Sequence, residues 1–511
     1  MTKPADLPND IETLKALLVA SESRNLRKQD RIDQLEKLVA DFKRVLFGAR
    51  SEKADPEQFE LSLEDIETAM AVVHAEDQAL DPSASRQAKP RITNRGSLPK
   101  HLPRIEEVIA PDSTICGCGG ERHVIGEDIS ERLDIIPAQF RVIVTRRPKY
   151  ACRSCTNGVV QAPAAARLIP GGMPTEATVA HVLVSKYADH LPLYRQAQIY
   201  SRQGIDLDRS TLAGWVGKAA YELRPVFDAL ITDLKRSTKL FMDETRAPVL
   251  DPGKRKTKTG YFWALARDDR PWGSTAPPGV AFTYASGRSG QYADDILKGF
   301  SGILQVDGYA GYNRLLKRAD DQVALAYCWA HARRKLHEVA QAGTAPIAED
   351  GLKQIAALYR IEKDIRGLTS EARLAARQVR SAPLMAAFEA WLTTNRARLS
   401  AKAPLGEALK YIAKYWGGLI LFLTDGRIEM DNNAVERTIR PIALNRKNAL
   451  FAGHDEGGRT WARMASLIET CKLNAVDPYA YLRATLTAIA NRHLASRIDD
   501  LMPWAFQKQS S

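Results

Sequence analysis

Three acidic residues that lie far apart in the chain have neighbours that suit metal-ion chemistry. Asp243 lies in the apolar run LFMDET, Asp307 follows the apolar run GILQV, and Glu436 lies in the polar stretch DNNAVERTIR. Two carboxylates a few ångströms apart repel each other unless one is protonated or a cation lies between them. Oxygen ligands favour Mg²⁺ or Mn²⁺. Two such ions would support an in-line phosphoryl displacement.

The elements predicted around Asp243 and Asp307 indicate how these two aspartates would meet. Three apolar or β-branched runs within residues 240–287, separated by polar turn sequence, predict an antiparallel meander. A helix over 291–300, a fourth strand before Asp307 and a strand-to-helix passage over 323–340 follow. This order of elements is that of the ribonuclease H fold. We therefore expect Asp243 on the first strand and Asp307 at the end of the fourth to be neighbours in the centre of the sheet.

The third acid, Glu436, is expected on a later helix. If the stretch NNAVERTIR is helical, Asn432, Glu436 and Arg440 lie one turn apart on a single face. Val435 and Ile439 would then point into the core, and the Glu436 carboxylate could ligate the metal. The alternative is an exposed helix that a Glu436–Arg440 ion pair stabilises.

Polar and basic residues around Glu436 predict contacts with a nucleic acid. Asn432 or Asn433 would cap the helix or hold a phosphate. The basic residues expected to bind the strand being cut are Arg437, Arg440, Arg446 and Lys447.

Four cysteines form two close pairs, Cys116 with Cys118 and Cys152 with Cys155. The strand-like run FRVIVTRRPKYAC separates the pairs, and a β-hairpin would bring four thiolates around one Zn²⁺. The metal would supply folding energy that so small a unit lacks. We therefore predict a zinc-finger-like module over residues 101–165, with free buried thiols as the alternative.

The N-terminal part of the chain has a seven-residue apolar repeat from Ile11 to Leu46, which predicts a coiled-coil or leucine-zipper segment over residues 1–50. Asn25 falls at a core position, where a buried polar residue would fix the register. A lone amphipathic helix that packs on its own protein is the alternative. Residues 51–100 are first acidic and then basic and rich in Ser and Pro, so we expect a linker there.

Residues 170–236 have a helical pattern that predicts a helix-turn-helix-like DNA-binding region. Gly204 and the polar residues 206–210 would form the turn. Arg209 and Lys218 would then meet phosphates, while the final helix reads bases. Three packed helices without a role in DNA binding are the alternative.

The composition is that of a soluble globular protein with more than one domain. A length of 511 residues is too great for one ordinary core, so two to four domains are expected. The net charge of +12 favours a polyanionic partner such as nucleic acid. No run of about 18 apolar residues and no N-terminal signal core are present, so we expect a cytoplasmic protein that contacts no membrane. Six cysteines in a reducing compartment argue against a disulfide framework.

The motifs MDETR, VDGYAGYN, CWAHARRK and DNNAVERTIRP occur in this order and precede the tail GHDEGGRTWARMASLIETCKLNAVDPYAYL. With these motifs, the zipper segment and the cysteine module, the chain resembles the insertion sequence 66 family of bacterial transposases over nearly its whole length. The resemblance implies that Asp243, Asp307 and Glu436 are a catalytic Asp-Asp-Glu triad. It also implies a ribonuclease H-like catalytic domain over 237–455, with a helical insertion over about 342–425.

The expected fold class is therefore multidomain α+β, with a mixed sheet flanked by helices and a C-terminal helical region over 456–511. The chain departs from the family's pattern at Cys116 and Cys118, which form C-G-C where C-x-x-C is typical. Cys328 and His331 look like a C-x-x-H element that similar transposases carry after the second aspartate. This element would position the scissile strand or support the fold. A metal site there is disfavoured because no third ligand is apparent, and a satisfied core histidine is the alternative for His331.

The resemblance implies a DNA transposase that binds the inverted ends of its own element and assembles them in a synaptic homo-oligomer. It would nick the DNA to expose 3′-hydroxyls and join these to target DNA, using two Mg²⁺ or Mn²⁺ ions, one structural Zn²⁺ and no ATP. Companion proteins of the same element are further expected partners, and the DNA-bound protein would be associated with the nucleoid. One alternative is a catalytically silent DNA-binding protein derived from a transposase. The other is an aspartyl-phosphate phosphatase, although Thr245 stands where that class needs a second aspartate.

Overall fold

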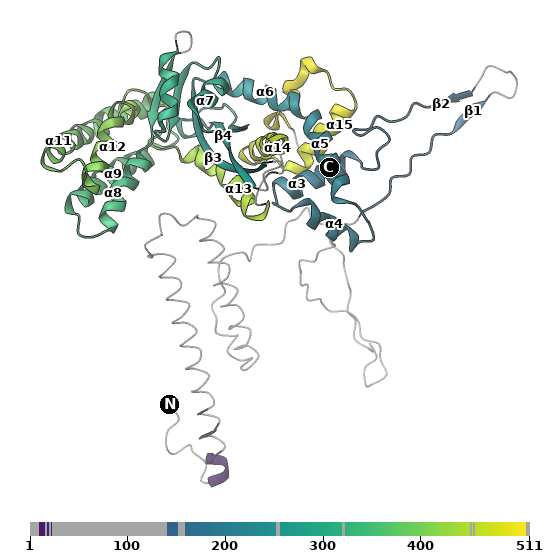
Figure 1. Cartoon of the computed structure of the whole chain (residues 1–511), viewed down its shortest axis with the longest axis horizontal. Helices are drawn as coiled ribbons and strands as arrows, with labels where there is room; N and C mark the ends of the chain where they lie inside the picture. The colour runs from purple at the N-terminus through teal and green to yellow at the C-terminus, as the bar shows by residue number, and fades with distance from the viewer. Residues whose placement is uncertain are drawn as a thin grey trace, which may run out of the picture. The chain divides into compact units, whose positions relative to one another are not determined.

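Figure 1 shows the computed structural model of the chain. Apart from short gaps, the structure describes residues 140–506, together with residues 10–15, 18, 19 and 22. The gaps are residues 152–158, 252–255, 319–321, 450–451 and 453–454. The chain divides into two units, residues 1–138 and 139–511, and the elements below all belong to the second.

Several predicted features lie outside the described residues. They are most of the coiled-coil segment over 1–50, the linker over 51–100, and the cysteines Cys116, Cys118, Cys152 and Cys155.

A five-stranded mixed sheet forms the centre of the second unit. Its strands are β3 (Lys239–Asp251), β4 (Lys256–Arg267), β5 (Gly279–Ala285), β6 (Gly302–Val306) and β7 (Val323–Tyr327), in the order β5-β4-β3-β6-β7. β4 runs antiparallel to both β3 and β5, so the predicted meander is confirmed. β6 runs parallel to both β3 and β7. The first strand along this part of the chain, β3, is therefore central, and the fourth, β6, is its parallel neighbour.

The central strand β3 opens with a run of apolar residues rather than an alternating pattern. Leu240, Phe241 and Met242 are all fully buried, although successive side chains of a strand point to opposite faces. Both faces of the sheet are therefore covered at this point, as is usual for strands with parallel neighbours. A buried strand of this kind can carry an acidic side chain into a site that is shielded from water.

The free edge of strand β5 is covered by the helix α14 (Asp455–Leu473). The hydroxyl of Ser466 accepts the N–H of Phe282 at 2.7 Å, and the hydroxyl of Thr470 accepts the N–H of Val280 at 3.1 Å. An uncovered edge strand presents unpaired donors that invite association with another chain. Hydroxyl groups of a helix satisfy these donors here, which closes the sheet at β5.

The helices that precede the sheet in the sequence and those that follow it share one hydrophobic core with the sheet. Before the sheet come α3 (Glu176–Tyr187), α4 (Leu193–Ser201), α5 (Arg209–Glu222) and α6 (Arg224–Lys235). After it come α13 (Asn433–Ala449), α14, α15 (Pro478–Ala490) and the 3₁₀ turns Ala495–Leu501 and Pro503–Ala505. α15 packs against α3, so the C-terminal helices close over the helices that precede the sheet.

The region predicted to resemble a helix-turn-helix contains the helices α3, α4 and α5. Gly204 has φ +78° in the turn before α5, a left-handed conformation that glycine adopts without a steric penalty. Asp208 is the N-cap residue of α5 by its extended backbone, but its side chain makes no capping hydrogen bond.

Between the sheet and α13 lies a second group of helices with its own core. After α7 (Gly290–Ile296), the 3₁₀ helix η4 (Ala310–Lys317) and β7, the chain forms α8 (Trp329–Gln341) and α9 (Pro346–Asp364). It continues with α10 (Ser370–Ala376), the π-helical turn η5 (Arg377–Ser381), α11 (Ala382–Arg398), α12 (Pro404–Leu419) and a short turn, Leu421–Leu423. Figure 1 shows α8, α9, α11 and α12 grouped beside the sheet. The helices from α9 to α12 fall within residues 342–425, where a helical insertion was expected, and α8 precedes that range.

Near residue 140 the structure differs from the predicted strand between the two cysteine pairs. Residues 141–148 are in no strand, and only Lys149–Ala151 form β1. The antiparallel partner of β1 is β2 (Val159–Gln161), which follows the second pair instead of preceding it. Cys152 and Cys155 therefore fall in the connection between β1 and β2.

Among the described helices none is long and apolar enough to cross a membrane.

Candidate active site

Asp243 and Asp307 lie at the same level of two neighbouring strands. The parallel register pairs Phe241 of β3 with Gln305 of β6. Asp243 follows two residues later on β3, and Asp307 follows two residues later, directly after the end of β6 at Val306. Carboxylate oxygens of Asp243, Asp307 and Glu244 lie within 4.8 Å of one another. Backbone N–H groups hold the first two in place, because Glu244 donates to Asp243 at 2.7 Å and Tyr309 donates to Asp307 at 2.8 Å. The proximity expected from the sequence is thus present in the structure.

The electrostatic surroundings of Asp243 disfavour its charged form. Burial raises the pKa of the Asp243 carboxyl well above its usual range, and the Asp307 carboxylate raises it further. The charges of Glu244 and Glu436 also raise this pKa, so Glu436 is near enough to influence Asp243. The protein therefore concentrates negative charge here without balancing it at Asp243, a situation that a divalent cation would relieve.

Glu244 was not predicted as part of this cluster, and its environment differs from that of the two aspartates. Tyr312 donates to Glu244 Oε2 at 2.7 Å, and Arg288 donates through Nε to Oε1 at 2.6 Å. The Arg288 guanidinium also lies over the ring of Tyr309, 4.2 Å from its centroid. Burial raises the pKa of Glu244, while the hydrogen bond from Tyr312 and the charge of Arg288 oppose the shift. A protein cation therefore balances Glu244, and we regard it as a support for its neighbours.

Glu436 lies in the first turn of α13, and a hydrogen bond of the Asn432 side chain ties the start of this helix to strand β3. Asn432 is fully buried, and its Nδ2 donates to the backbone oxygen of Met242 at 3.2 Å, next to Asp243. Val435 and Ile439 are buried in the core, as predicted from the helical pattern. Because its side chain is fully buried, Asn432 has no room to hold a phosphate, contrary to one of the predicted roles.

Asn433 follows directly and begins α13. Its backbone N–H donates to Asp431 Oδ1 at 3.1 Å, so an aspartate side chain receives one of the first donors of the helix. Burial raises the pKa of Asp431, and this hydrogen bond opposes the shift. No ion pair joins Glu436 to Arg440 among the described residues, so the alternative of an exposed, self-stabilised helix lacks its expected contact.

A second set of ligand atoms meets at Glu436. Cys328 Sγ, His331 Nδ1 and a Glu436 carboxylate oxygen lie within 4.8 Å of one another, with His331 Nδ1 4.0 Å from Glu436 Oε1. Both of these last atoms are buried and have no hydrogen-bond partner among the described residues. Burial lowers the pKa of His331, which Glu436 opposes, whereas burial and Glu436 raise the pKa of the Cys328 thiol to about 12. The expectation that Cys328 and His331 lack a third ligand nearby is therefore wrong, because that ligand lies more than a hundred residues later in the sequence.

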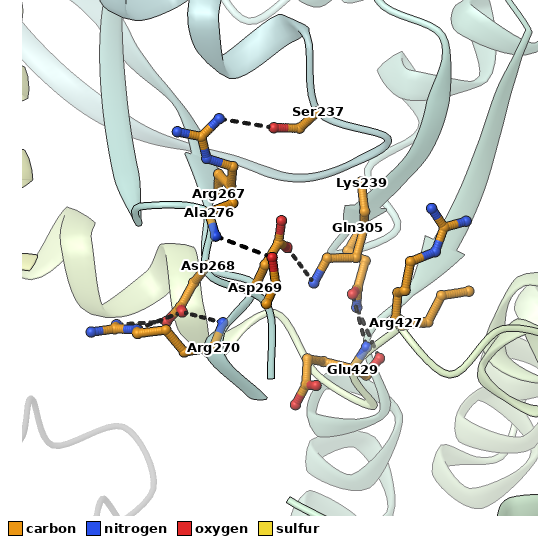
Figure 2. A network of polar contacts seen from close by, with 12 residues as sticks. Ser237, Lys239, Arg267, Asp268, Asp269, Arg270, Ala276, Gln305, Arg427 and Glu429 are labelled. Atoms are coloured by element: carbon orange, nitrogen blue, oxygen red, sulfur yellow. Dashed lines mark hydrogen bonds and ion pairs between the residues drawn. The ribbon is translucent and has the colours of Figure 1, made fainter. Parts of the chain in front are cut away.

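The loop that leads into α13 is clamped to β6 by an amide side chain (Figure 2). Gln305 Nε2 donates to the backbone oxygen of Glu429 at 2.8 Å, and the N–H of Glu429 donates to Gln305 Oε1 at 2.9 Å. The backbone N–H of Trp329, at the start of α8, donates to the oxygen of Met430 at 2.8 Å. The residues just before Asn432 are thus held by the strand that leads to Asp307 and by the helix that carries His331.

Beside this clamp lies a buried cluster of alternating charges (Figure 2). Lys239 Nζ lies 3.6 Å from Asp269 Oδ1, and Arg373 of α10 lies 2.7 Å from Glu429 Oε1. Burial lowers the pKa of Lys239, and the charges of Asp269 and Glu429 oppose the shift. These groups connect the start of β3 to α10 through Glu429.

The basic residues predicted to contact DNA differ in exposure and in their ion pairs. Arg437 and Arg440 are exposed on α13, and Arg209 is exposed at the start of α5. Lys218 is half-buried and forms an ion pair with Glu222 of the same helix at 2.5 Å. The side chains of Arg446 and Lys447 lie outside the described part of the chain.

Comparison with protein families gives four matches along the chain. The family model described as "Transposase IS66 family" matches residues 171–460, which include all the acidic residues above. The "zinc-finger binding domain of transposase IS66" matches residues 113–156, which contain the four cysteines of the predicted module. The "IS66 C-terminal element" matches residues 466–504, and the "Transposase C of IS166 homeodomain" matches residues 34–106.

Curated relatives from Sinorhizobium fredii are similar to the chain over nearly its full length. The uncharacterized protein y4jD is 44% identical, over 98% of this chain and 96% of its own. The uncharacterized protein y4qI is 42% identical, over 98% of both chains. The uncharacterized protein y4hP is 38% identical, over 93% of this chain and 89% of its own.

Proposed function

The chain belongs to the IS66 family of transposases, and from this premise we propose that it cleaves and joins DNA strands at a site formed by Asp243, Asp307 and Glu436. The observation that carries the proposal is the closeness of the Asp243 and Asp307 carboxylates, on β3 and directly after β6. The charge of Glu436, from a third segment, raises the pKa of Asp243, which supports including Glu436 in the site. A purely structural role would not need so much unbalanced negative charge.

The arrangement of the sheet supports a ribonuclease H-like core. Three consecutive antiparallel strands are followed by two parallel ones, and the first strand is central. In this order the ends of β3 and β6 offer adjacent positions for two acids, and a later helix can supply the third.

The donor set fits hard divalent cations. Arg288 and Tyr312 occupy Glu244, whereas no ion pair to Asp243 or Asp307 occurs among the described residues. Glu436 contributes a buried oxygen that has no hydrogen-bond partner within the described ranges. Asp243, Asp307 and Glu436 would therefore hold two Mg²⁺ or Mn²⁺ ions, which when bound activate the attacking hydroxyl and neutralise the departing oxygen of the phosphodiester.

Residues of the chain itself would bind and orient the DNA. Arg437 and Arg440 are exposed within one turn of Glu436 on α13, so their guanidinium groups can contact phosphates beside the bond to be cut. Arg209 at the start of α5 is a further phosphate contact in this proposal. The DNA bound in this way would be the inverted ends of the element and then the target. Assembly of both ends requires a homo-oligomer, and companion proteins of the element are further partners.

The cysteine module completes the proposal. Cys116, Cys118, Cys152 and Cys155 all fall within the segment that is similar to a zinc-finger binding domain, and we assign to them one structural Zn²⁺. The β1–β2 pair would support the second pair of thiolates, because Cys152 follows β1 directly.

The test is nicking of DNA that contains the element ends, in Mg²⁺, by the full chain and its variants. Asp243→Asn, Asp307→Asn and Glu436→Gln should each lower the cleavage rate by at least about 100-fold. Asp364→Asn is the matched control, because Asp364 is an exposed carboxylate of α9 whose contact is a surface ion pair with Arg380. Wild-type activity in any of the first three variants would contradict the assignment.

Mn²⁺ binding by the same proteins gives a readout that does not depend on turnover. The three site variants should bind Mn²⁺ more weakly than the wild type, and Asp364→Asn should not. Metal binding together with DNA binding but without any cleavage, even when companion proteins are present, would instead favour a catalytically silent DNA-binding protein.

A further inference from the structure

The starts of two helices meet at Glu436 and bring three different ligand types together. Cys328 directly precedes α8, His331 lies in the first turn of α8, and Glu436 lies in the first turn of α13. Their spacing of three residues places Cys328 and His331 on the same side of the helix start. The sulfur, the Nδ1 nitrogen and the carboxylate oxygen all lie within 4.8 Å of one another.

Two of the three atoms are buried polar groups without a hydrogen bond in the described part of the chain. His331 Nδ1 and Glu436 Oε1 lie 4.0 Å apart, too far for a hydrogen bond, and neither has another partner there. Buried polar atoms are nearly always paired, because leaving one unpaired costs free energy. A shared ligand between these two atoms would satisfy both.

The sulfur of Cys328 is held in a fixed position by its surroundings. The thiol is almost fully buried, and the backbone N–H of Asn432 donates to Sγ at 3.2 Å. Asn432 is held in turn by its hydrogen bond to Met242 of β3, so the donor has a fixed position. Hydrogen bonds to a ligating atom orient it and tune the metal site.

We propose that Cys328, His331 and Glu436 form a binding site for a divalent transition metal, with Zn²⁺ as the preferred ion. One sulfur, one nitrogen and one oxygen ligand are a set that zinc accepts, with a fourth position open to water or substrate. Mg²⁺ disfavours sulfur and nitrogen ligands, so this set discriminates against the ions expected at Asp243 and Asp307. The site shares only Glu436 with the proposed catalytic centre.

The experiment is zinc analysis of the full chain after equilibration with Zn²⁺ and removal of free metal, without DNA. Cys328→Ser should bind one equivalent of zinc fewer than the wild type. The serine hydroxyl can still accept the N–H of Asn432, so the local fold is retained. Cys471→Ser is the matched control, because Cys471 is the other buried free cysteine among the described residues and lies on α14. Zinc held by the N-terminal cysteine module contributes equally to all these proteins.

His331→Ala and Glu436→Gln test the other two ligands, and Co²⁺ provides a spectroscopic check. In wild type and Cys471→Ser, Co²⁺ should give a larger sulfur-to-cobalt charge-transfer absorbance than in Cys328→Ser. Equal zinc content in wild type, Cys328→Ser and His331→Ala would overturn the site, and full zinc content in Glu436→Gln would remove Glu436 from it. Because the readout is metal content, absence of strand cleavage by the wild type would count against the proposed function and leave this result standing.

Discussion

Gln305 is the residue whose replacement best tests how Glu436 is positioned. Gln305→Ala removes two hydrogen bonds, of 2.8 and 2.9 Å, that clamp Glu429 to β6. Gln305 is buried, so the N–H and C=O of Glu429 would be left with poor access to water. A buried group deprived of its partner costs about 1–3 kcal/mol. For the two groups together this range is about 2–6 kcal/mol. We expect the free energy of unfolding to fall by about 2–4 kcal/mol, in the lower part of that range, because the loop can relax.

The same substitution should affect chemistry more than stability alone explains. Glu429 precedes Asn432 and Glu436 by three and seven residues, and the clamp joins that loop to the strand that ends at Asp307. Misplacement of a reacting group by about 1 Å can cost about 100-fold in rate. We expect strand cleavage by the folded variant to slow by about 10- to 100-fold, together with weaker Mn²⁺ binding.

Gln196→Ala is the control that separates stability from positioning. Gln196 is equally buried, and its Nε2 donates to the oxygens of Leu191 at 3.0 Å and Val182 at 3.3 Å. Chemical denaturation should give a similar loss of stability for both variants, but cleavage per folded molecule should fall only for Gln305→Ala. Equal cleavage rates in the two variants would refute the positioning role, as would a Gln305→Ala protein with wild-type stability.

Three other perturbations have outcomes that follow from the structure. In the folded protein the pKa of Asp243 is raised above its ordinary value of 3.8. The metal-free protein therefore loses stability as the pH rises from 3.8 through the pKa that Asp243 has in the folded state. Asp243→Asn should therefore melt at a higher temperature than wild type at pH 7 in a chelator, and added Mg²⁺ should stabilise only the wild type. Gly302→Ala should lower the free energy of unfolding, measured in urea, by about 2–4 kcal/mol, because Gly302 has φ +141° and a Cβ there would overlap the Thr238 carbonyl. Gly217 has open space around it, so the free energy of unfolding of Gly217→Ala should stay within about 1 kcal/mol of the wild-type value. Cys152→Ser should lose one equivalent of zinc in metal analysis of the full chain, and an unchanged zinc content would remove Cys152 from the module.

The parts of the site that the sequence predicts are those set by local patterns. The apolar run before Asp243 predicts a buried strand, and the run before Asp307 predicts another, because each pattern reflects burial over a few consecutive residues. The helix around Glu436 follows in the same way from Val435 and Ile439, which are buried. Once the order of strands is inferred, the meeting of the two aspartates requires no further information.

The parts that the sequence does not predict depend on contacts between distant segments. Gln305 and Glu429 are separated by 124 residues, and the N–H that reaches Cys328 comes from a residue 104 positions away. A glutamine in an apolar strand gives no sign of the backbone groups that it will pair with. Glu244 adjoins Asp243 in the sequence, which makes it a candidate for the same acidic cluster. Strand alternation alone would place its side chain on the other face of the sheet. Its pairing with Arg288 is visible only in three dimensions.

Several helices lie between β7 and α13, and contacts at both ends of this segment keep Glu436 in place. The backbone N–H of Trp329, the first residue of α8, donates to the oxygen of Met430, which follows the last of these helices. Within the segment, the fully buried Arg377 forms an ion pair with Glu362 at 2.7 Å. Its guanidinium also donates to the carbonyl oxygens of Phe422, Asp425 and Ile428. The returning chain is thus fixed before it reaches the clamp at Gln305, so changes in the outer helices of this segment need not move Glu436.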